Sequence, residues 1–518
     1  MNDGVHGREL WKSDGTDAGT VLVKDIRPGS LAASPGSFTA VGNILYFSAY
    51  DGTNGRELWK SDGTDAGTVL VYDINPGEGN SSPGSFSGIG GVVYFAAYDG
   101  TNGRELWRSD GTANGTWLLA DIGKVGGDST PVEVITIGGT SYFIADDGTR
   151  GNHALWRSDG TTIGTVLVKN IDIASNTLTV IGSTLYFSAD DHINGRELWK
   201  SDGTAAGTVL VKDIQSGASS ASPDNFTAVD NILYFIADDG VTGEELWKSD
   251  GTAAGTVQVK DINFGANSSN SFNLTAVDSR LYFHADDRIN GRELWKSDGT
   301  AAGTVMVKDI WSGSSGSSLS DLTAVGDTLY FRADDGTNGR ELWKSDGTAT
   351  GTVMVKDIRS GSSGSFPDNL MAVGSTLYFN AYDGVHGREL WKSDGTAAGT
   401  VLVKDIRSGS ADASFSHFTA VSNTLYFSVY GNGNGRELWR SDGTATGTVL
   451  VKDIRPGPFS AFPDNLTAVG NTLYFNADDG VHGRELWKSD GTDAGTVMVK
   501  DINPNFEAGS DPVPLNVN

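Results

Sequence analysis

The sequence has no cysteine, no long apolar run and few basic residues, and each absence excludes a class of protein. Without cysteine there is no disulfide framework and no thiolate chemistry. No apolar run approaches the about 18 residues that a membrane-spanning helix needs, so we expect no membrane insertion. The 38 Lys and Arg are outnumbered by 65 Asp and Glu, which gives a net charge of -27. This balance argues against a nucleic-acid partner, because contacts with phosphates need a basic surface.

The sequence is dominated by one repeated phrase, Glu-Leu-Trp-Lys/Arg-Ser-Asp-Gly-Thr, with small departures. Successive copies are 48 residues apart, except for one step of 49 and one of 43 in the region 123–181. A fixed period of this length is typical of repeat architectures. The tryptophans of the phrase are Trp11, Trp59, Trp107, Trp156, Trp199, Trp247, Trp295, Trp343, Trp391, Trp439 and Trp487.

One repeat predicts four short strands. In the copy at 466–502 the apolar segments are 466–469, 472–477, 484–489 and 497–502, separated by turns rich in Gly, Asn and Asp. Such short connections predict antiparallel hairpins. Leu486 and Trp487 are adjacent and therefore point to opposite faces, so both faces of the sheet must be covered. We predict an all-β fold, a β-propeller with one four-stranded blade per repeat.

The copies do not divide evenly into blades. Eleven copies of the third and fourth strands accompany only ten of the first and second. We predict a single propeller domain over 1–518, with the outer half of the first blade at 1–26, ten full repeats at 27–502 and a closing segment at 503–518, whose residues 513–517 match a first strand. One large ring of ten to eleven blades is expected. The alternative is two smaller propellers of five to six blades, while tight turns in every repeat disfavour a parallel β-solenoid.

The repeated tryptophans are interpreted as core residues between neighbouring blades, with sugar stacking as the functional alternative. No catalytic constellation emerges from the sequence. His6, His386 and His482 share one turn position that is Asn in several other copies, which is typical of a solvated turn residue. The symmetry of the repeats is broken only in the irregular region 123–181, which is interpreted as a degenerate blade, that is, one that has lost part of the repeated pattern. We therefore expect that the chain is not an enzyme and name no catalytic residue.

Paired carboxylates recur in the turns. We interpret them as caps of backbone N–H groups. The alternative is calcium held by turn carboxylates, although these turns lack the alternate-residue spacing of known calcium loops. No other cofactor is expected. The candidate metal ligands are Asp190, Asp191, Asp286, Asp287, Asp478 and Asp479.

The phrase that begins at Glu197 and continues through Asp202-Gly203-Thr204 to Thr208 resembles the naming motif of the ELW-x-x-DGT repeat family of large bacterial proteins. The resemblance covers essentially the whole chain. Two copies depart from it: Trp156 lacks the preceding Glu, and Glu244 replaces the usual Arg. The resemblance implies highly symmetric propellers at the cell surface or outside the cell, often beside adhesion or calcium-binding modules. It supplies no catalytic residues.

We therefore expect a non-enzymatic extracellular scaffold for binding or adhesion, multivalent towards polysaccharides or surface proteins, because near-identical blades would offer many equivalent surfaces. Two alternatives stay open. One is a propeller enzyme with an axial site, similar to quinoprotein dehydrogenases, and the other is a purely structural spacer. Residues 3–21 repeat residues 479–497 letter for letter, so the chain begins within a repeat and any targeting signal is expected upstream.

Overall fold

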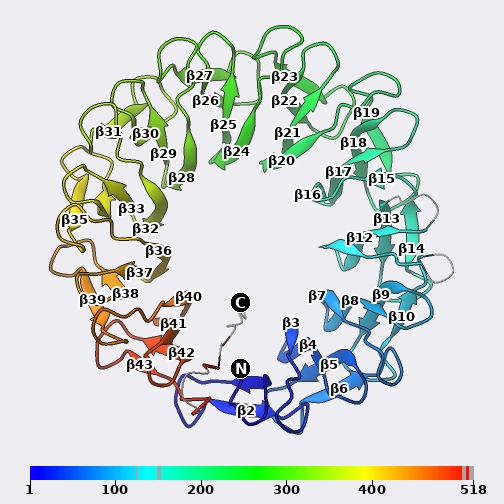
Figure 1. Cartoon of the computed structure of the whole chain (residues 1–518). Helices are drawn as coiled ribbons and strands as arrows, with labels where there is room; N and C mark the ends of the chain where they lie inside the picture. The colour runs from blue at the N-terminus through cyan, green and yellow to red at the C-terminus, as the bar shows by residue number, and fades with distance from the viewer. Residues whose placement is uncertain (124–126, 149–152, 505–508, 511, 513–518) are drawn as a thin grey trace. The chain divides into compact units, whose positions relative to one another are not determined.

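The computed structural model describes residues 1–123, 127–148, 153–504, 509, 510 and 512. As predicted, the chain is all-β and built of repeated four-stranded antiparallel sheets. It separates into two compact units, one formed by Met1–Ser222 with Val499–Asn518 and the other by Pro223–Met498. In Figure 1 the four strands of each sheet lie side by side in chain order.

The first unit contains five sheets in the part of the chain that is described. Their strands are β1 (Leu10–Lys12) and β2 (Val21–Lys24); β3 (Gly36–Val41), β4 (Ile44–Tyr50), β5 (Arg56–Ser61) and β6 (Val69–Tyr72); β7 (Gly84–Ile89), β8 (Val92–Tyr98), β9 (Arg104–Ser109) and β10 (Trp117–Ala120); β11 (Val132–Ile137), β12 (Thr140–Asp146), β13 (His153–Ser158) and β14 (Val166–Lys169); and β15 (Asp172–Ile173), β16 (Thr179–Ile181), β17 (Thr184–Asp190), β18 (Arg196–Ser201) and β19 (Val209–Lys212).

The second unit contains six four-stranded sheets. Their strands are β20 (Asp224–Val229), β21 (Ile232–Asp238), β22 (Glu244–Ser249) and β23 (Val257–Lys260); β24 (Phe272–Val277), β25 (Arg280–Asp286), β26 (Arg292–Ser297) and β27 (Val305–Lys308); β28 (Ser320–Val325), β29 (Thr328–Asp334), β30 (Arg340–Ser345) and β31 (Val353–Lys356); β32 (Asp368–Val373), β33 (Thr376–Tyr382), β34 (Arg388–Ser393) and β35 (Val401–Lys404); β36 (Ser416–Val421), β37 (Thr424–Tyr430), β38 (Arg436–Ser441) and β39 (Val449–Lys452); and β40 (Asp464–Val469), β41 (Thr472–Asp478), β42 (Arg484–Ser489) and β43 (Val497–Met498).

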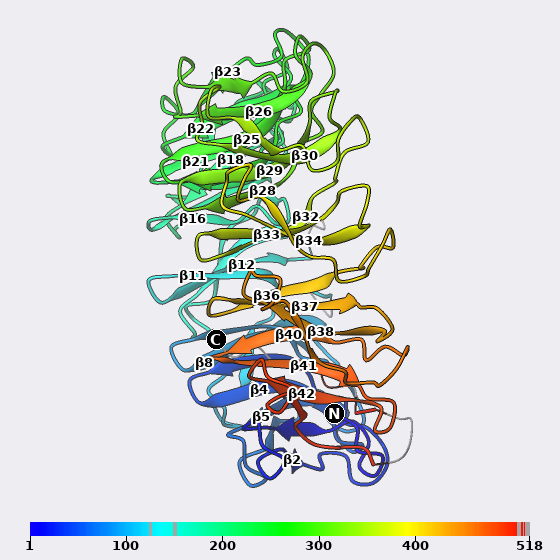
Figure 2. The same cartoon turned by 90° about the vertical axis from the view of Figure 1, so that its left-hand side faces the viewer.

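Both faces of a sheet are buried, as the adjacent Leu and Trp predict. In the sheet of β28–β31, Phe331 and Trp343 pack on the preceding sheet, in one cluster with Leu294. On the other face, Tyr330 and Leu342 pack on the following sheet. Figure 2 shows successive sheets of the second unit in layers. The apolar area buried between consecutive sheets therefore holds each repeat in place, because a single repeat of this size buries too little alone.

The strand limits differ from the predicted ones at both edges of the sheet. The first strand starts earlier, at Asp464 in β40, and contains an irregularity between Asp464 and Thr467, where Asn465 has a φ of 51°. This is a β-bulge, which places an extra residue in one strand. The fourth strand ends earlier, at Lys452 in β39, because Ile454 turns into the core instead of continuing the ladder.

The irregular region contains a complete sheet, β11–β14, in its described residues. The shortened connection after it splits the next first strand into β15 and β16, which both pair with β17. The short repeat spacing therefore changes an edge strand and leaves the packed strands intact. The predicted closing strand at 513–517 lies outside the described residues.

Candidate functional site

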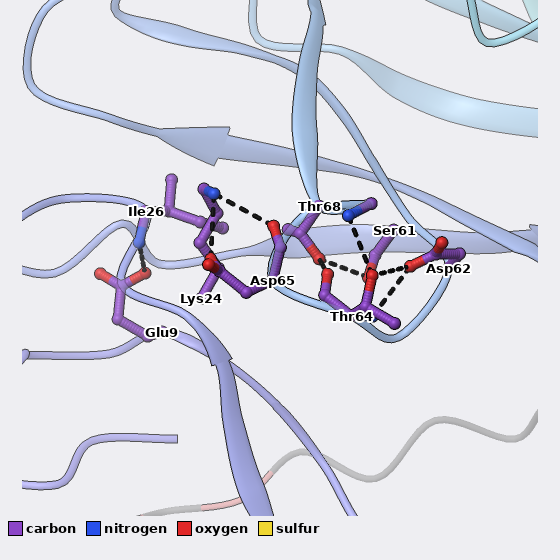
Figure 3. A network of polar contacts seen from close by, with 9 residues as sticks. Glu9, Lys24, Ile26, Ser61, Asp62, Thr64, Asp65 and Thr68 are labelled. Carbon is purple, nitrogen blue, oxygen red and sulfur yellow. Dashed lines mark hydrogen bonds and ion pairs between the residues drawn. The ribbon is translucent and has the colours of Figure 1, made fainter.

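The glutamate of the repeated phrase, which is present in every copy except the one with Trp156, holds the connection that leads to the next sheet. Glu9 accepts hydrogen bonds from the backbone N–H of Ile26 and of Ala33, both at 2.9 Å, and Figure 3 shows the first of these. Glu9 is 1% exposed. Burial raises the pKa of Glu9 to about 7, against the effect of these N–H donors. The glutamate therefore has a structural role within the repeat.

The Ser-Asp-Gly-Thr segment forms a loop that is closed by its own side chains (Figure 3). Asp62 Oδ1 accepts hydrogen bonds from the N–H and the hydroxyl of Thr64, at 2.8 and 2.7 Å. Ser61 and Thr68 join their hydroxyls at 2.7 Å across the base of the loop. The same contacts recur in the sister copies, so this part of the phrase is explained by local structure.

The repeated tryptophans lie between sheets, and several of them contact a lysine from the preceding repeat. Lys308 lies over the Trp343 ring at 5.6 Å from its centroid and donates to the carbonyl of Thr352 at 2.8 Å. Eight of the eleven indoles are 4–6% exposed, while Trp11, Trp156 and Trp439 are partly exposed. These side chains hold neighbouring sheets together, and their burial leaves little ring surface for stacking on a sugar.

The candidate metal ligands cap turns. Asp191 Oδ1 accepts the N–H groups of Ile193 and Asn194 at 2.9 and 2.7 Å, and Asp287 makes the equivalent contacts. Although burial acts in the opposite direction, these donors hold the pKa of Asp191 below its usual value. Asp190, Asp286 and Asp478 each accept one turn N–H, and Asp479 accepts two. Within the described residues, no group of three or more His, Asp or Glu side chains is placed to hold a metal ion. Calcium binding stays a prediction.

The histidines of the turns act as hydrogen-bond partners of an aspartate. His386 Nδ1 lies 2.6 Å from Asp383 Oδ2, and this hydrogen bond raises the pKa of His386. In a sister copy Asn54 makes the same contact, with its amide 2.6 Å from Asp51 Oδ2. Among the described residues no serine hydroxyl is hydrogen-bonded to His386. The pairing resembles part of a catalytic triad, but its replacement by Asn shows a turn-capping role.

The symmetry of the repeats is also broken outside the irregular region, at the fifth residue of the second strand. This position is buried or half-buried, and its side chain changes from one sheet to the next while its neighbours Phe and Ala or Val stay apolar. The residues are Ser48, Ala96, Ile144, Ser188, Ile236, His284, Arg332, Asn380, Ser428 and Asn476. The prediction that only the degenerate blade in region 123–181 departs from the symmetry of the repeats is therefore wrong.

A pocket of about 400 Å³ lies beside one of these variable positions, at the sheet of β32–β35. It is lined by Phe366, Tyr382, Arg388, Ser410 and Asp412, which come from two inter-sheet connections and from the facing ends of β33 and β34. Three segments distant in sequence therefore contribute to one hollow. A pocket with an aromatic ring, a cation and a carboxylate has the composition of a small-molecule site.

The Arg388 guanidinium is fixed in this pocket without using all its donors. One nitrogen, Nη1, donates to the carbonyl of Phe366 at 2.9 Å and to Oδ1 of Asn380 at 2.7 Å. Its Nε and Nη2 make no hydrogen bond within the part of the chain that the structure describes, and they face no carboxylate within ion-pair distance there. The sister Arg484 is instead paired with Asp464, and Arg196 with Asp172. Arg388 is therefore a positioned cation with free donors.

Phe366 adds strained backbone to the same pocket. Its φ is 48°, in the left-handed region that a bulky side chain rarely adopts. The N–H of Phe366 donates to the carbonyl of Arg340 at 2.9 Å, which holds this conformation. Ser34 and Ser82 occupy the equivalent position in the first unit. Phe462 occupies the same position in the last sheet, also with a φ of 48°, so the second unit has a phenyl ring at this place in two copies.

None of these pocket residues was predicted from the sequence. The signal was present in a comparison of the repeats with one another, because the combination of Phe366, Tyr382, Arg388 and Asp412 occurs in one copy. The period of the phrase does not show this combination, because the period is defined by the residues that the copies share.

No protein-family model and no curated protein sequence matches the chain. Solved structures do match. They include a puromycin hydrolase, at 14% identity over 75% of this chain with a TM-score of 0.30, and a puromycin-hydrolyzing peptidase of Mycobacterium tuberculosis, at 12% over 83% with a TM-score of 0.28. A third is prolyl oligopeptidase B from Galerina marginata, at 10% over 64% with a TM-score of 0.31. The chain spans 62%, 61% and 50% of the length of these three proteins.

These matches contradict two expectations from the sequence. The matching structures are those of hydrolases and peptidases, so the prediction of a non-enzymatic binding or adhesion scaffold, and of a chain that is not an enzyme, is corrected. At TM-scores near 0.3 the likeness places no active site in this chain. The described residues include no helix with the length and apolar character that a membrane-spanning helix needs.

Proposed function

We propose that this chain is a substrate-recognition domain of a hydrolytic enzyme, and that the pocket around Arg388 binds the substrate. The observation that carries the proposal is the Arg388 guanidinium, which is held by Phe366 and Asn380 while its Nε and Nη2 remain available. The matching structures are those of hydrolases and peptidases, and these are the types of enzyme to test. The turn histidines act as caps, and the proposal assigns no catalytic residue.

The pocket is suited to a ligand with both signs of charge and an apolar group. Free guanidinium donors bind a carboxylate through two parallel hydrogen bonds. Asp412 uses Oδ1 to accept the N–H of Arg388 at 2.9 Å, and its exposed carboxylate balances an ammonium group. Phe366 and Tyr382 line the pocket with aromatic surface for an apolar side chain, although each ring also has an arginine over it, Arg340 at 5.7 Å and Arg359 at 4.4 Å from the ring centroid. A short peptide with a free carboxyl end has these three features.

The test is a titration of the full chain with the dipeptide Gly-Phe, followed by isothermal titration calorimetry. We expect saturable binding, and weaker binding of Gly-Phe amide, which lacks the carboxylate. Arg388→Gln should weaken binding about 10- to 100-fold, because a hydrogen bond to a charged group contributes about 1.5–3 kcal/mol.

The sister arginine Arg104 provides the matched control, because Ser82 stands there in place of Phe366. Arg104→Gln should leave the affinity unchanged. Equal loss in both variants, or no saturable binding, would overturn the proposal.

The arrangement of the sheets around an axis is also a proposal. We propose that the sheets are propeller blades around an axis, supported by the packing of each sheet between two neighbours. The single ring of ten to eleven blades, and its alternative of two smaller propellers, stay predictions that small-angle scattering can separate. Membership of the ELW-x-x-DGT repeat family, an extracellular location and a polysaccharide or surface-protein partner also stay predictions.

A further inference from the structure

A second pocket lies in the second unit, between the sheet of β24–β27 and the sheet of β28–β31. Its volume is about 330 Å³, and its lining includes Asp278, Arg280, Tyr282, Asp327 and Asp346. The lining comes from the turn before β25 and the start of β25, from the turn between β28 and β29, and from the loop after β30. Two neighbouring sheets therefore form one hollow. Its volume is at the lower end of the range of small-molecule pockets, about 300–1,000 Å³.

Three of the charged side chains in this pocket are departures from the repeat. Where Arg280 stands, the nine other second strands of the described residues begin with Thr, Ile or Val. The second residue of the turn before this strand is Asn, Ser or Gly in the other copies and is acidic only at Asp327. The first residue of the same turn is acidic at Asp278 and Asp230 and is Gly or Ser elsewhere. Because copies without these charges form the same hairpin, the fold does not require them.

The Arg280 guanidinium has no protein partner in the part of the chain that the structure describes. There it makes no hydrogen bond and has no carboxylate within ion-pair distance, and its side chain is exposed. Its Nη1 lies 3.6 Å from the point that a Cβ atom at Gly347 would occupy, so the guanidinium reaches the loop of the next sheet. A guanidinium pairs with a carboxylate through two parallel hydrogen bonds. Arg280 is therefore available to a carboxylate of a ligand.

Two of the three carboxylates in the pocket are also available. Asp278 and Asp327 are exposed, and neither makes a hydrogen bond or an ion pair within the described residues. Asp346 differs, because its Oδ1 accepts the N–H and the hydroxyl of Thr348 at 2.8 and 2.7 Å. The charge of the nearby Lys296 also acts on the Asp346 carboxylate and helps to hold its pKa below the usual value. The pocket therefore offers one cation and two anions that no protein group compensates.

This balance of charges differs from that of the Arg388 pocket and selects a different ligand. Tyr282 is 4% exposed, so its ring offers little surface to an apolar group. A complementary ligand has one carboxylate, two cationic groups and no large apolar part. A free dibasic amino acid has these features in a molecule of suitable size.

We propose that this pocket binds a free dibasic amino acid such as L-lysine, at a site separate from the Arg388 pocket. Arg280 binds the α-carboxylate, and Asp278 and Asp327 bind the two ammonium groups. The site does not depend on the hydrolytic function proposed above.

The experiment is a calorimetric titration of the full chain with L-lysine, with L-norleucine and with cadaverine. Norleucine lacks the side-chain ammonium group of lysine, and cadaverine lacks the carboxylate. We expect saturable binding of lysine in the millimolar range, because the charged groups of the pocket are exposed and exposed ion pairs contribute little. Norleucine and cadaverine should each bind at least about threefold more weakly, since each loses one charged contact.

The matched variants replace a charge by the residue that other copies carry, Arg280→Thr and Asp327→Asn, so their melting temperatures should equal that of the original chain. Arg280→Thr should weaken lysine binding at least about threefold and remove the preference for lysine over cadaverine. Asp327→Asn should weaken lysine binding and reduce the preference for lysine over norleucine. Glu78→Gln, which removes an exposed charge in the first unit, should leave the affinity unchanged.

Three results would overturn the proposal. The first is no saturable binding of lysine, and the second is binding of norleucine or cadaverine that equals or exceeds that of lysine. The third is an Arg280→Thr variant that binds lysine like the original chain. Arg388→Gln should not change lysine binding, and a loss in that variant would place lysine in the Arg388 pocket and would also contradict the proposal.

Discussion

The buried glutamate of each repeat gives the sharpest test of how the repeats are held. Glu341 is fully buried and accepts hydrogen bonds from the N–H of Ile358 and of Arg359, both at 3.1 Å, and from the hydroxyl of Ser365 at 2.5 Å. Glu341→Ala would leave these donors unpaired in a buried site. Each unsatisfied group costs about 1–3 kcal/mol, so three of them predict a loss of about 3–9 kcal/mol in the free energy of unfolding.

The contribution of Glu341 to the free energy of unfolding should decrease as the pH rises. Burial raises the pKa of Glu341 to about 7, above its ordinary value of 4.5. The folded state therefore binds the proton more tightly than the unfolded state, and the stability from this group is complete below about pH 4.5 and is lost as pH rises through about 7. A shift of this size corresponds to about 3 kcal/mol per site as an upper value.

Glu341→Gln isolates this contribution, because an amide cannot ionise. We expect the variant to be less stable than the original chain at pH 5 and to improve relative to it by up to about 3 kcal/mol at pH 8. Urea unfolding at the two pH values measures the difference, and Glu78→Gln, on an exposed connection, is the control. If the cost of Glu341→Gln does not fall between pH 5 and pH 8, the pKa of Glu341 is not raised in the folded state and the reasoning is refuted.

Three other predictions follow from the repeated contacts. Gly351→Ala should lower the free energy of unfolding by about 1–3 kcal/mol, because the new methyl group would overlap the Asp346 carboxylate; thermal unfolding against Gly36→Ala, where nothing lies within 4 Å, tests this. Lys308→Met should cost about 0.5–2 kcal/mol by removing the contacts with Trp343 and the Thr352 carbonyl; an unchanged urea midpoint would contradict it. Asp383→Asn should lower the pKa of His386 towards its ordinary value, since the hydrogen bond from Asp383 is the main cause that raises it; NMR titration of the ring measures this, and His386 should then keep a raised pKa in Glu244→Gln, a distant change.

The sequence by itself determined the repeated unit. The period of the phrase, the four apolar segments and the turn residues between them are local patterns, and backbone geometry converts such patterns into hairpins wherever they occur. The adjacent Leu342 and Trp343 also showed that both faces are buried, since neighbouring residues of a strand point in opposite directions. These features were predicted correctly because each depends on residues within a few positions of one another.

The hydrogen-bond partners of the charged residues that recur in each repeat were decided only by the tertiary structure. Glu341 bonds to residues 17 to 24 positions away, and Lys308 reaches Thr352, 44 positions away, in the next sheet. The Arg388 pocket joins the facing ends of β33 and β34 with two inter-sheet connections. A periodic sequence specifies its strands locally, whereas a site forms where segments from different repeats meet, and the packing between sheets brings those segments together.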